Sequence, residues 1–238
     1  MARSGFAGFP PEGIQFLRDL AKNNQRDWFQ PRKEIFEAKV KEPMRELVDA
    51  LNGAMQKFAP DHVTDPDKAI YRIYRDTRFS KNKTPYKDHI AANFKPRSLA
   101  QPEGAGYYVA VSHKEVAVGG GIYMPSPPTL LAVRNHLAER FEEFERVTKT
   151  RELKRLLGGE LHGDRLTRPP KGFAAEHPAA EALKLKSLFF YVELPPDLAT
   201  SKTMFAEVRK RFEAIAPFVD FLNMPFKGKK KPGARGLF

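Results

Sequence analysis

The sequence predicts an α+β fold: a single domain with a mainly antiparallel central sheet, flanked by N-terminal and C-terminal helices. Three observations predict it. Helical patterns, with apolar residues three and four apart, gather towards the two ends of the chain, whereas alternating β-forming stretches dominate the middle. The strand candidates include a hairpin and no repeating β–α–β unit. The length of 238 residues stays within the reach of one hydrophobic core, and we expect the domain to span residues 1–226.

The N-terminal region predicts two helical stretches. The first begins after Phe9, because proline is tolerated in the first turn of a helix, and ends near Asn23. The second runs from Asp27 to about Phe58 with one apolar stripe. Pro43 interrupts this stripe, so we expect a kink or two consecutive helices there.

Four segments are expected to share the sheet, because each carries β-branched or aromatic residues. They are residues 70–75, 106–112, 115–119 and 187–194, and residues 89–94 are a further candidate. The second and third segments flank His113 and Lys114, which indicates a hairpin. We expect Gly119–Gly121 to end that hairpin.

The remaining elements follow from capping signals. Ser126 is expected to cap a helix with Leu130, Val133, Leu137 and Phe141 on one face. Short helices are expected at residues 142–148 and 151–157, and a loop at residues 159–180. Ser201 is expected to cap the last helix.

Composition excludes several kinds of site. The chain has no Cys, which excludes disulfides, a thiol nucleophile, thiolate zinc and an iron–sulfur cluster. Its six His residues show no ligand spacing, so we expect no metal site; whether the protein uses a cofactor is left open. There is neither an apolar run of about 20 residues nor a signal peptide, so we expect a cytoplasmic protein without a membrane partner.

The net charge of +12 is concentrated in two places. Residues 68–97 hold nine Lys or Arg against two Asp, and residues 227–238 hold five Lys or Arg and no acid. We expect an anion site in the first segment and a disordered basic tail in the second.

The basic segment suggests a ligand site because Arg clamps phosphate or carboxylate groups, while Lys supplies point charge. In this interpretation Asp76 orients an Arg, and Phe79 or Tyr86 covers the organic part of the ligand. The candidate binding residues are Arg72, Arg75, Asp76, Arg78, Phe79, Ser80, Lys81, Lys83, Tyr86, Lys87 and His89.

Other interpretations of the same residues stay open. The arginines of an architectural hairpin would pair with Asp76, Asp88 and distant acids. Alternatively, the basic segment and the tail follow a nucleic-acid backbone, or the basic face docks an acidic protein. His89 beside an Asp could move protons, so enzymatic activity is left undecided.

The string RIYRDTRFSKNKTPYKDH, residues 72–89, resembles the signature of domain-of-unknown-function family 2461. The resemblance covers roughly residues 6–224 and leaves out the basic tail. It implies a single-domain, mostly bacterial, intracellular protein with no established activity or catalytic residues. Further matching segments are residues 16–29, Gly106–Tyr108, Gly119–Gly121, Pro170–Phe173, His177–Pro178 and Lys186–Ser187.

Overall fold

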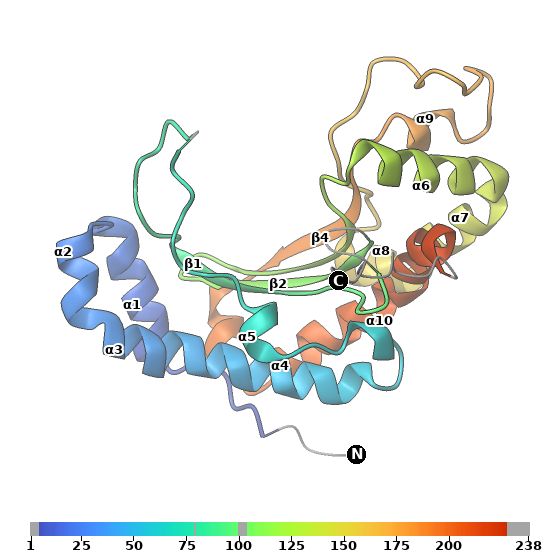
Figure 1. Ribbon diagram of the computed structural model, residues 1–238. Helices are drawn as coiled ribbons and strands as arrows, with labels where there is room; N and C mark the ends of the chain where they lie inside the picture. The colour runs from blue at the N-terminus through green and yellow to red at the C-terminus, as the bar shows by residue number, and fades with distance from the viewer. Residues whose placement is uncertain (1–4, 79, 100–103, 228–238) are drawn as a thin grey trace, which may run out of the picture.

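A four-stranded antiparallel sheet lies at the centre of the computed structural model, which describes residues 5–78, 80–99 and 104–227. Its strands follow one another in the order of the chain, and helices from both ends of the chain flank it (Figure 1). The predicted α+β class is therefore confirmed. The strands are β1 (His89–Phe94), β2 (Gly106–Ser112), β3 (Val116–Ile122) and β4 (Leu188–Leu194).

Most helices are short, apart from α1, α4, α6 and α10. The α-helices are α1 (Pro11–Lys22), α2 (Arg26–Phe29), α3 (Lys33–Phe36), α4 (Glu42–Met55), α5 (Pro66–Ala69), α6 (Pro127–Glu139), α7 (Phe141–Thr148), α8 (Arg151–Leu157), α9 (Ala180–Leu183) and α10 (Met204–Asn223). Short 3-10 turns lie at Gln30–Arg32, Pro60–His62, Pro196–Thr200 and Met224–Phe226, and a π turn at Glu37–Lys41. No helix in the described ranges is long and apolar enough to cross a membrane.

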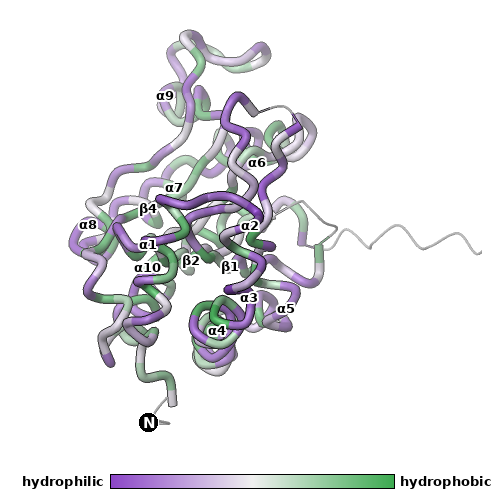
Figure 2. Tube along the Cα trace, turned by 90° about the vertical axis from the view of Figure 1, so that its left-hand side faces the viewer, coloured by the Kyte–Doolittle hydropathy of each residue, from purple (hydrophilic) through white to green (hydrophobic). Residues whose placement is uncertain are grey.

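The helices cover one face of the sheet. Helices α4 and α10 lie beneath it in Figure 1 and contact one another, and Figure 2 shows α4 as the lower of the two. The rings of Phe94 and Tyr107 contact Phe212 of α10, and the ring of Phe190 contacts Phe218. In the part of the chain that the structure describes, no helix lies over the centre of the opposite face. We call this opposite face the open face.

The predicted interruption at Pro43 is present as the π turn Glu37–Lys41, which directly precedes α4. Proline has no N–H to donate to the carbonyl four residues earlier, here that of Lys39, and its ring crowds that carbonyl. A wider turn relieves this conflict. Gly13 of α1 packs against the same turn: a Cβ at Gly13 would lie 2.1 Å from the Lys39 carbonyl oxygen.

The prediction of a strand at residues 70–75 is wrong, and residues 89–94 form the edge strand instead. The segment makes only isolated bridges, at Ile70 with Ala92 and at Tyr74 with Tyr86. It leaves the sheet edge and pairs with the chain just ahead of β1. Pro85 has no N–H with which to extend a ladder, so this pairing stays irregular.

The hairpin is confirmed, but Gly119–Gly121 lie inside β3 and do not end it. Flanking strands approach so closely that a Cβ at Gly119 would lie 2.6 Å from the Phe190 carbonyl oxygen. The Ser126 cap is confirmed by its hydrogen bond from the Thr129 N–H, although α6 ends before Phe141.

The predicted Ser201 cap is wrong by two residues. Helix α10 begins at Met204 with Thr203 at the N-cap position, and the Ser201 hydroxyl accepts a hydrogen bond from the Thr203 N–H. The hydroxyl therefore closes a turn before the helix and does not cap its first turn.

One continuous hydrophobic cluster extends from Phe6 to Phe226. The division into a domain of residues 1–226 and a tail stays a prediction, because residues 228–238 lie outside the described ranges. Lys227 is described, and its ammonium contacts the Asp220 carboxylate at 3.3 Å.

Candidate functional site

The candidate ligand residues lie on an extended arm that rises from the edge of the sheet between α5 and β1 (Figure 1). We call residues 70–88 the basic arm. Its two limbs are joined by backbone hydrogen bonds from Arg75 N–H to the Pro85 carbonyl (2.9 Å) and from Lys87 N–H to the Ile73 carbonyl (2.8 Å). Tyr71 N–H donates to the Ala91 carbonyl at 2.9 Å and so ties the arm to β1.

Tyr86 anchors the arm to the N-terminal helices. Its ring is buried and stacks on Phe29 with 4.2 Å between centroids. The Asn24 side chain hydrogen-bonds both the N–H and the carbonyl of Tyr86, each at 3.0 Å. Tyr86 is thus a core residue, and its ring is not available to cover a ligand; the other predicted cover, Phe79, lies outside the described residues.

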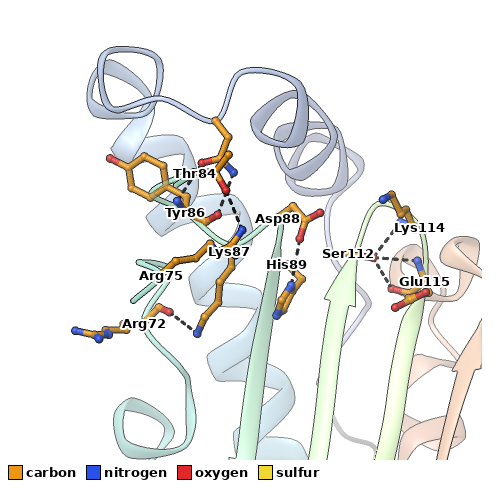
Figure 3. A network of polar contacts seen from close by, with 11 residues as sticks. Arg72, Arg75, Thr84, Tyr86, Lys87, Asp88, His89, Ser112, Lys114 and Glu115 are labelled. Carbon is orange, nitrogen blue, oxygen red and sulfur yellow. Dashed lines mark hydrogen bonds and ion pairs between the residues drawn. The ribbon is translucent and has the colours of Figure 1, made fainter. Parts of the chain in front are cut away.

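Neutral groups of the arm hold three of its cations, two of which, Arg75 and Lys87, are labelled in Figure 3. Arg75 donates to the Thr84 hydroxyl at 2.8 Å, Lys83 to the Thr77 carbonyl at 2.9 Å, and Lys87 to the Arg72 carbonyl at 3.0 Å. The Lys87 ammonium also lies 5.1 Å from the centroid of the Tyr71 ring. Burial and the charge of Arg72 lower the pKa of Lys87.

Asp76 pairs with Arg78. Two guanidinium nitrogens reach the carboxylate at 3.1 and 2.8 Å, a contact that the ligand-site and the architectural interpretations both predict. Hydrogen bonds from Arg78 and the charge of Arg72 lower the pKa of Asp76. Arg72 and Lys81 are exposed, and Ser80 is half-buried with its N–H directed to the Thr77 carbonyl.

The arm ends at a cavity of about 220 Å³ on the open face, where Asp88 and His89 meet the β2–β3 hairpin (Figure 3). His89 Nδ1 lies 3.3 Å from an Asp88 carboxylate oxygen. Burial raises the pKa of Asp88, but the hydrogen bond from His89 and the nearby charges of His89 and Lys114 outweigh it and lower the pKa.

Two parts of the sheet contribute cavity residues that no sequence pattern singled out: the β2–β3 hairpin contributes Tyr108, Ser112, Lys114 and Glu115, and β4 contributes Tyr191. Burial and the Glu193 carboxyl raise the pKa of Glu115. The sequence pattern places Tyr108, Ser112 and Glu115 in or next to predicted strands. Only the pairing of β2 with β1 brings them close to His89, which lies opposite Ser112 in the strand register. In the described ranges, no three His, Asp or Glu side chains are grouped so as to hold a metal ion.

The comparisons with known proteins bear on the family alone. No curated protein and no solved structure gives a significant match to this chain. The model of a family described as a conserved hypothetical protein, DUF2461, matches residues 12–221, from the first turn of α1 almost to the end of α10. This match covers well over half of the chain and confirms the resemblance of the 72–89 motif. The chain therefore belongs to the DUF2461 family.

Proposed function

We propose that the protein binds a phosphate- or carboxylate-bearing ligand through the basic arm. One observation carries the proposal: of the six arm cations, Arg78 alone has a carboxylate within 4.0 Å in the described residues. Several helical cations elsewhere pair with acids three or four residues away, as Arg155 does with Glu152 and Lys41 with Glu37. The arm therefore carries positive charge that no neighbouring carboxylate neutralises: the cations without such a partner are Arg72, Arg75, Lys81, Lys83 and Lys87.

The arm is also organised before a ligand arrives. Hydroxyl and carbonyl groups orient Arg75, Lys83 and Lys87 without cancelling their charge. An anion that binds such an arm relieves the repulsion among the cations. The side chains of the arm are already oriented, so they lose little conformational entropy when it binds. In this role Asp76 orients Arg78. The anion is held by Arg75, Arg78, Lys81, Lys83 and Lys87.

The test is thermal unfolding across phosphate concentrations at constant ionic strength. Phosphate should raise the melting temperature of the wild type by mass action. Replacing two exposed cations, Arg72→Gln with Lys81→Gln, should diminish that rise while shifting the phosphate-free melting temperature by less than about 2 °C. Equal responses in wild type and variant would mean that the arm is architectural.

A matched control removes the same charge elsewhere. Lys57 and Lys202 are exposed and lie outside the arm, after α4 and before α10. The variant Lys57→Gln with Lys202→Gln should keep the wild-type phosphate response, because its net charge equals that of the arm variant.

Two exposed rings support nucleic-acid binding as a second candidate. Tyr71 is 42% and Tyr74 44% exposed, and they flank Arg72, so stacking and phosphate contact are available together. Anisotropy of a labelled single-stranded oligonucleotide across salt concentrations would measure this. The arm variant should flatten the slope of log Kd against log salt if the arm follows a phosphate backbone.

A further inference from the structure

We propose a second binding site, on the open face of the sheet, for a small molecule that joins a flat aromatic ring to an anionic group. The site is a cavity of about 570 Å³, which falls in the range of small-molecule pockets. We call it the sheet-face pocket. It adjoins the cavity at His89 through two shared residues, Tyr108 and Tyr191, and none of the arm cations lines it.

The floor of the sheet-face pocket is bare backbone. Gly106 pairs with Gly121 in the strand register, and Gly119 sits between Tyr108 and Tyr191. A Cβ at Gly106 or Gly121 would lie 2.3 Å from a carbonyl oxygen of the neighbouring strand. Strand packing therefore requires glycine at both positions, and the result is a flat surface on which a ring can lie.

Aromatic side chains surround this floor. Tyr108 and Tyr191 flank Gly119 where the pocket adjoins the cavity at His89, and Tyr71 lies towards β1. Phe189 lies on β4, and Tyr123 is edge-on to it at 5.6 Å. Tyr123 is 71% exposed, so a ligand ring would cover apolar surface that now faces water.

The rim of the pocket also holds a strained residue. Met124 has φ +47°, in the left-handed region, and is the one non-glycine residue of the described ranges with positive φ. Its N–H donates to the Ser187 hydroxyl at 2.9 Å, which fixes the turn. Such strain persists where the surroundings impose it and gathers at ligand sites. Here it keeps Tyr123 and Met124 at the mouth of the pocket.

The charge of the pocket favours an anionic group on the ligand. Lys95 is the one charged side chain among the described residues that line the pocket. Burial, Tyr71 and Glu115 raise the pKa of Tyr108 to about 12, so its hydroxyl stays protonated and able to donate. One cation and a neutral donor suit a single phosphate or carboxylate group attached to the ring.

The test is isothermal titration of the full chain with 1-naphthyl phosphate, inorganic phosphate and neutral 1-naphthol. The wild type should bind 1-naphthyl phosphate about tenfold more tightly than inorganic phosphate. In the background of Arg72→Gln with Lys81→Gln, which weakens phosphate binding at the arm, Lys95→Met should weaken binding of 1-naphthyl phosphate to about the level of 1-naphthol. Tyr191→Leu, and the exposed Tyr123→Ser in case the first variant does not fold, should weaken both aromatic probes.

Two controls separate this site from its neighbours. Lys114→Met alters the cavity at His89 and should bind 1-naphthyl phosphate like the wild type. Arg72→Gln with Lys81→Gln alters the arm; it should lose only the weaker phosphate binding there and keep the tighter binding of 1-naphthyl phosphate. Adenosine monophosphate, tested beside 1-naphthyl phosphate, distinguishes a nucleotide from another aryl phosphate, and preferential binding of either supports the site. No saturable binding of either compound, or wild-type affinity in both Lys95→Met and Tyr123→Ser, would overturn the proposal, whatever phosphate does at the arm.

Discussion

The side-chain amide of Asn24 hydrogen-bonds both backbone polar groups of Tyr86, 62 residues further along the chain. An amide side chain presents a donor and an acceptor side by side, so Asn24 acts on Tyr86 as a neighbouring strand would. With the Tyr86 ring stacked on Phe29, these bonds fix the basic arm to the turn between α1 and α2. The position of the arm cations therefore depends on the N-terminal helices.

Asn24→Ala should lower the free energy of unfolding by about 1–3 kcal/mol, because two partly buried backbone groups lose their partner. The variant should also be cleaved more readily within the arm, since the anchor that holds it is weakened. Urea denaturation and limited proteolysis measure the two effects. The adjacent exposed Gln25, mutated to Ala, is the control and should behave like the wild type; unchanged stability of Asn24→Ala would contradict the role of the anchor.

Two glycine substitutions should have opposite effects. Gly13→Ala should destabilise the protein by about 1–3 kcal/mol, because the new Cβ would lie 2.1 Å from the Lys39 carbonyl oxygen. Gly53→Ala should stabilise it by up to about 1 kcal/mol, because Gly53 lies in α4 with nothing within 4 Å of an added Cβ. Urea denaturation compares them, and a neutral Gly13→Ala would show that α1 can move away from the π turn.

Acidification should destabilise the protein through His62. This ring is buried, and its Nε2 lies 3.0 Å from the Ala105 carbonyl oxygen. Burial lowers its pKa below the ordinary 6.5, so near and below that pH the unfolded chain binds a proton that the folded protein does not. The stability that neutral His62 contributes is complete above pH 6.5 and is lost as the pH falls towards the lowered pKa.

Denaturation of wild type and His62→Gln at about pH 7.5 and about pH 5.5 measures this contribution. Gln can still donate to the carbonyl but does not titrate, so the variant should lose less stability on acidification. Burial also lowers the pKa of His113 and His136, which should leave a residual loss in both proteins. Identical losses would exclude His62 as a source of the pH dependence.

Met124→Gly should raise the free energy of unfolding by up to about 1 kcal/mol, because glycine adopts the left-handed region without the strain of a side chain. Met124 is 75% exposed, so little packing is lost. Tyr123→Gly is the matched control: it should destabilise, since Tyr123 lacks positive φ and contacts Phe189. A loss of stability in Met124→Gly would mean that its side chain contributes more than the strain costs.

Local patterns predicted most of the elements of this fold. The cap at Ser126, the hairpin around His113 and Lys114 and the interruption near Pro43 each depend on residues within a few positions of one another. The misplaced cap at Ser201 is a local error, whereas the misplaced strand at residues 70–75 depends on distant partners. Residues 70–75 alternate like a strand, but they pair with Pro85 and Lys87, and β1 occupies the sheet edge.

The candidate site likewise has features that the local sequence predicts and features that depend on distant residues. The cations of the arm are adjacent in the sequence, so their grouping was predictable, whereas the burial of Tyr86 depends on Phe29 and Asn24. The cavity at His89 needs β2 and β4 beside β1, and residue alternation alone does not say which strands are neighbours.

By itself, the sequence determined the α+β class, the family and the concentration of charge at residues 72–89, because periodicity, motif and charge are properties of short segments. Only the tertiary structure decided which cations have a carboxylate partner, which face of the sheet stays open, and that Gly106, Gly119 and Gly121 line one pocket. These depend on strand order and register, which are set by contacts between residues far apart in the chain, and such contacts leave no local pattern.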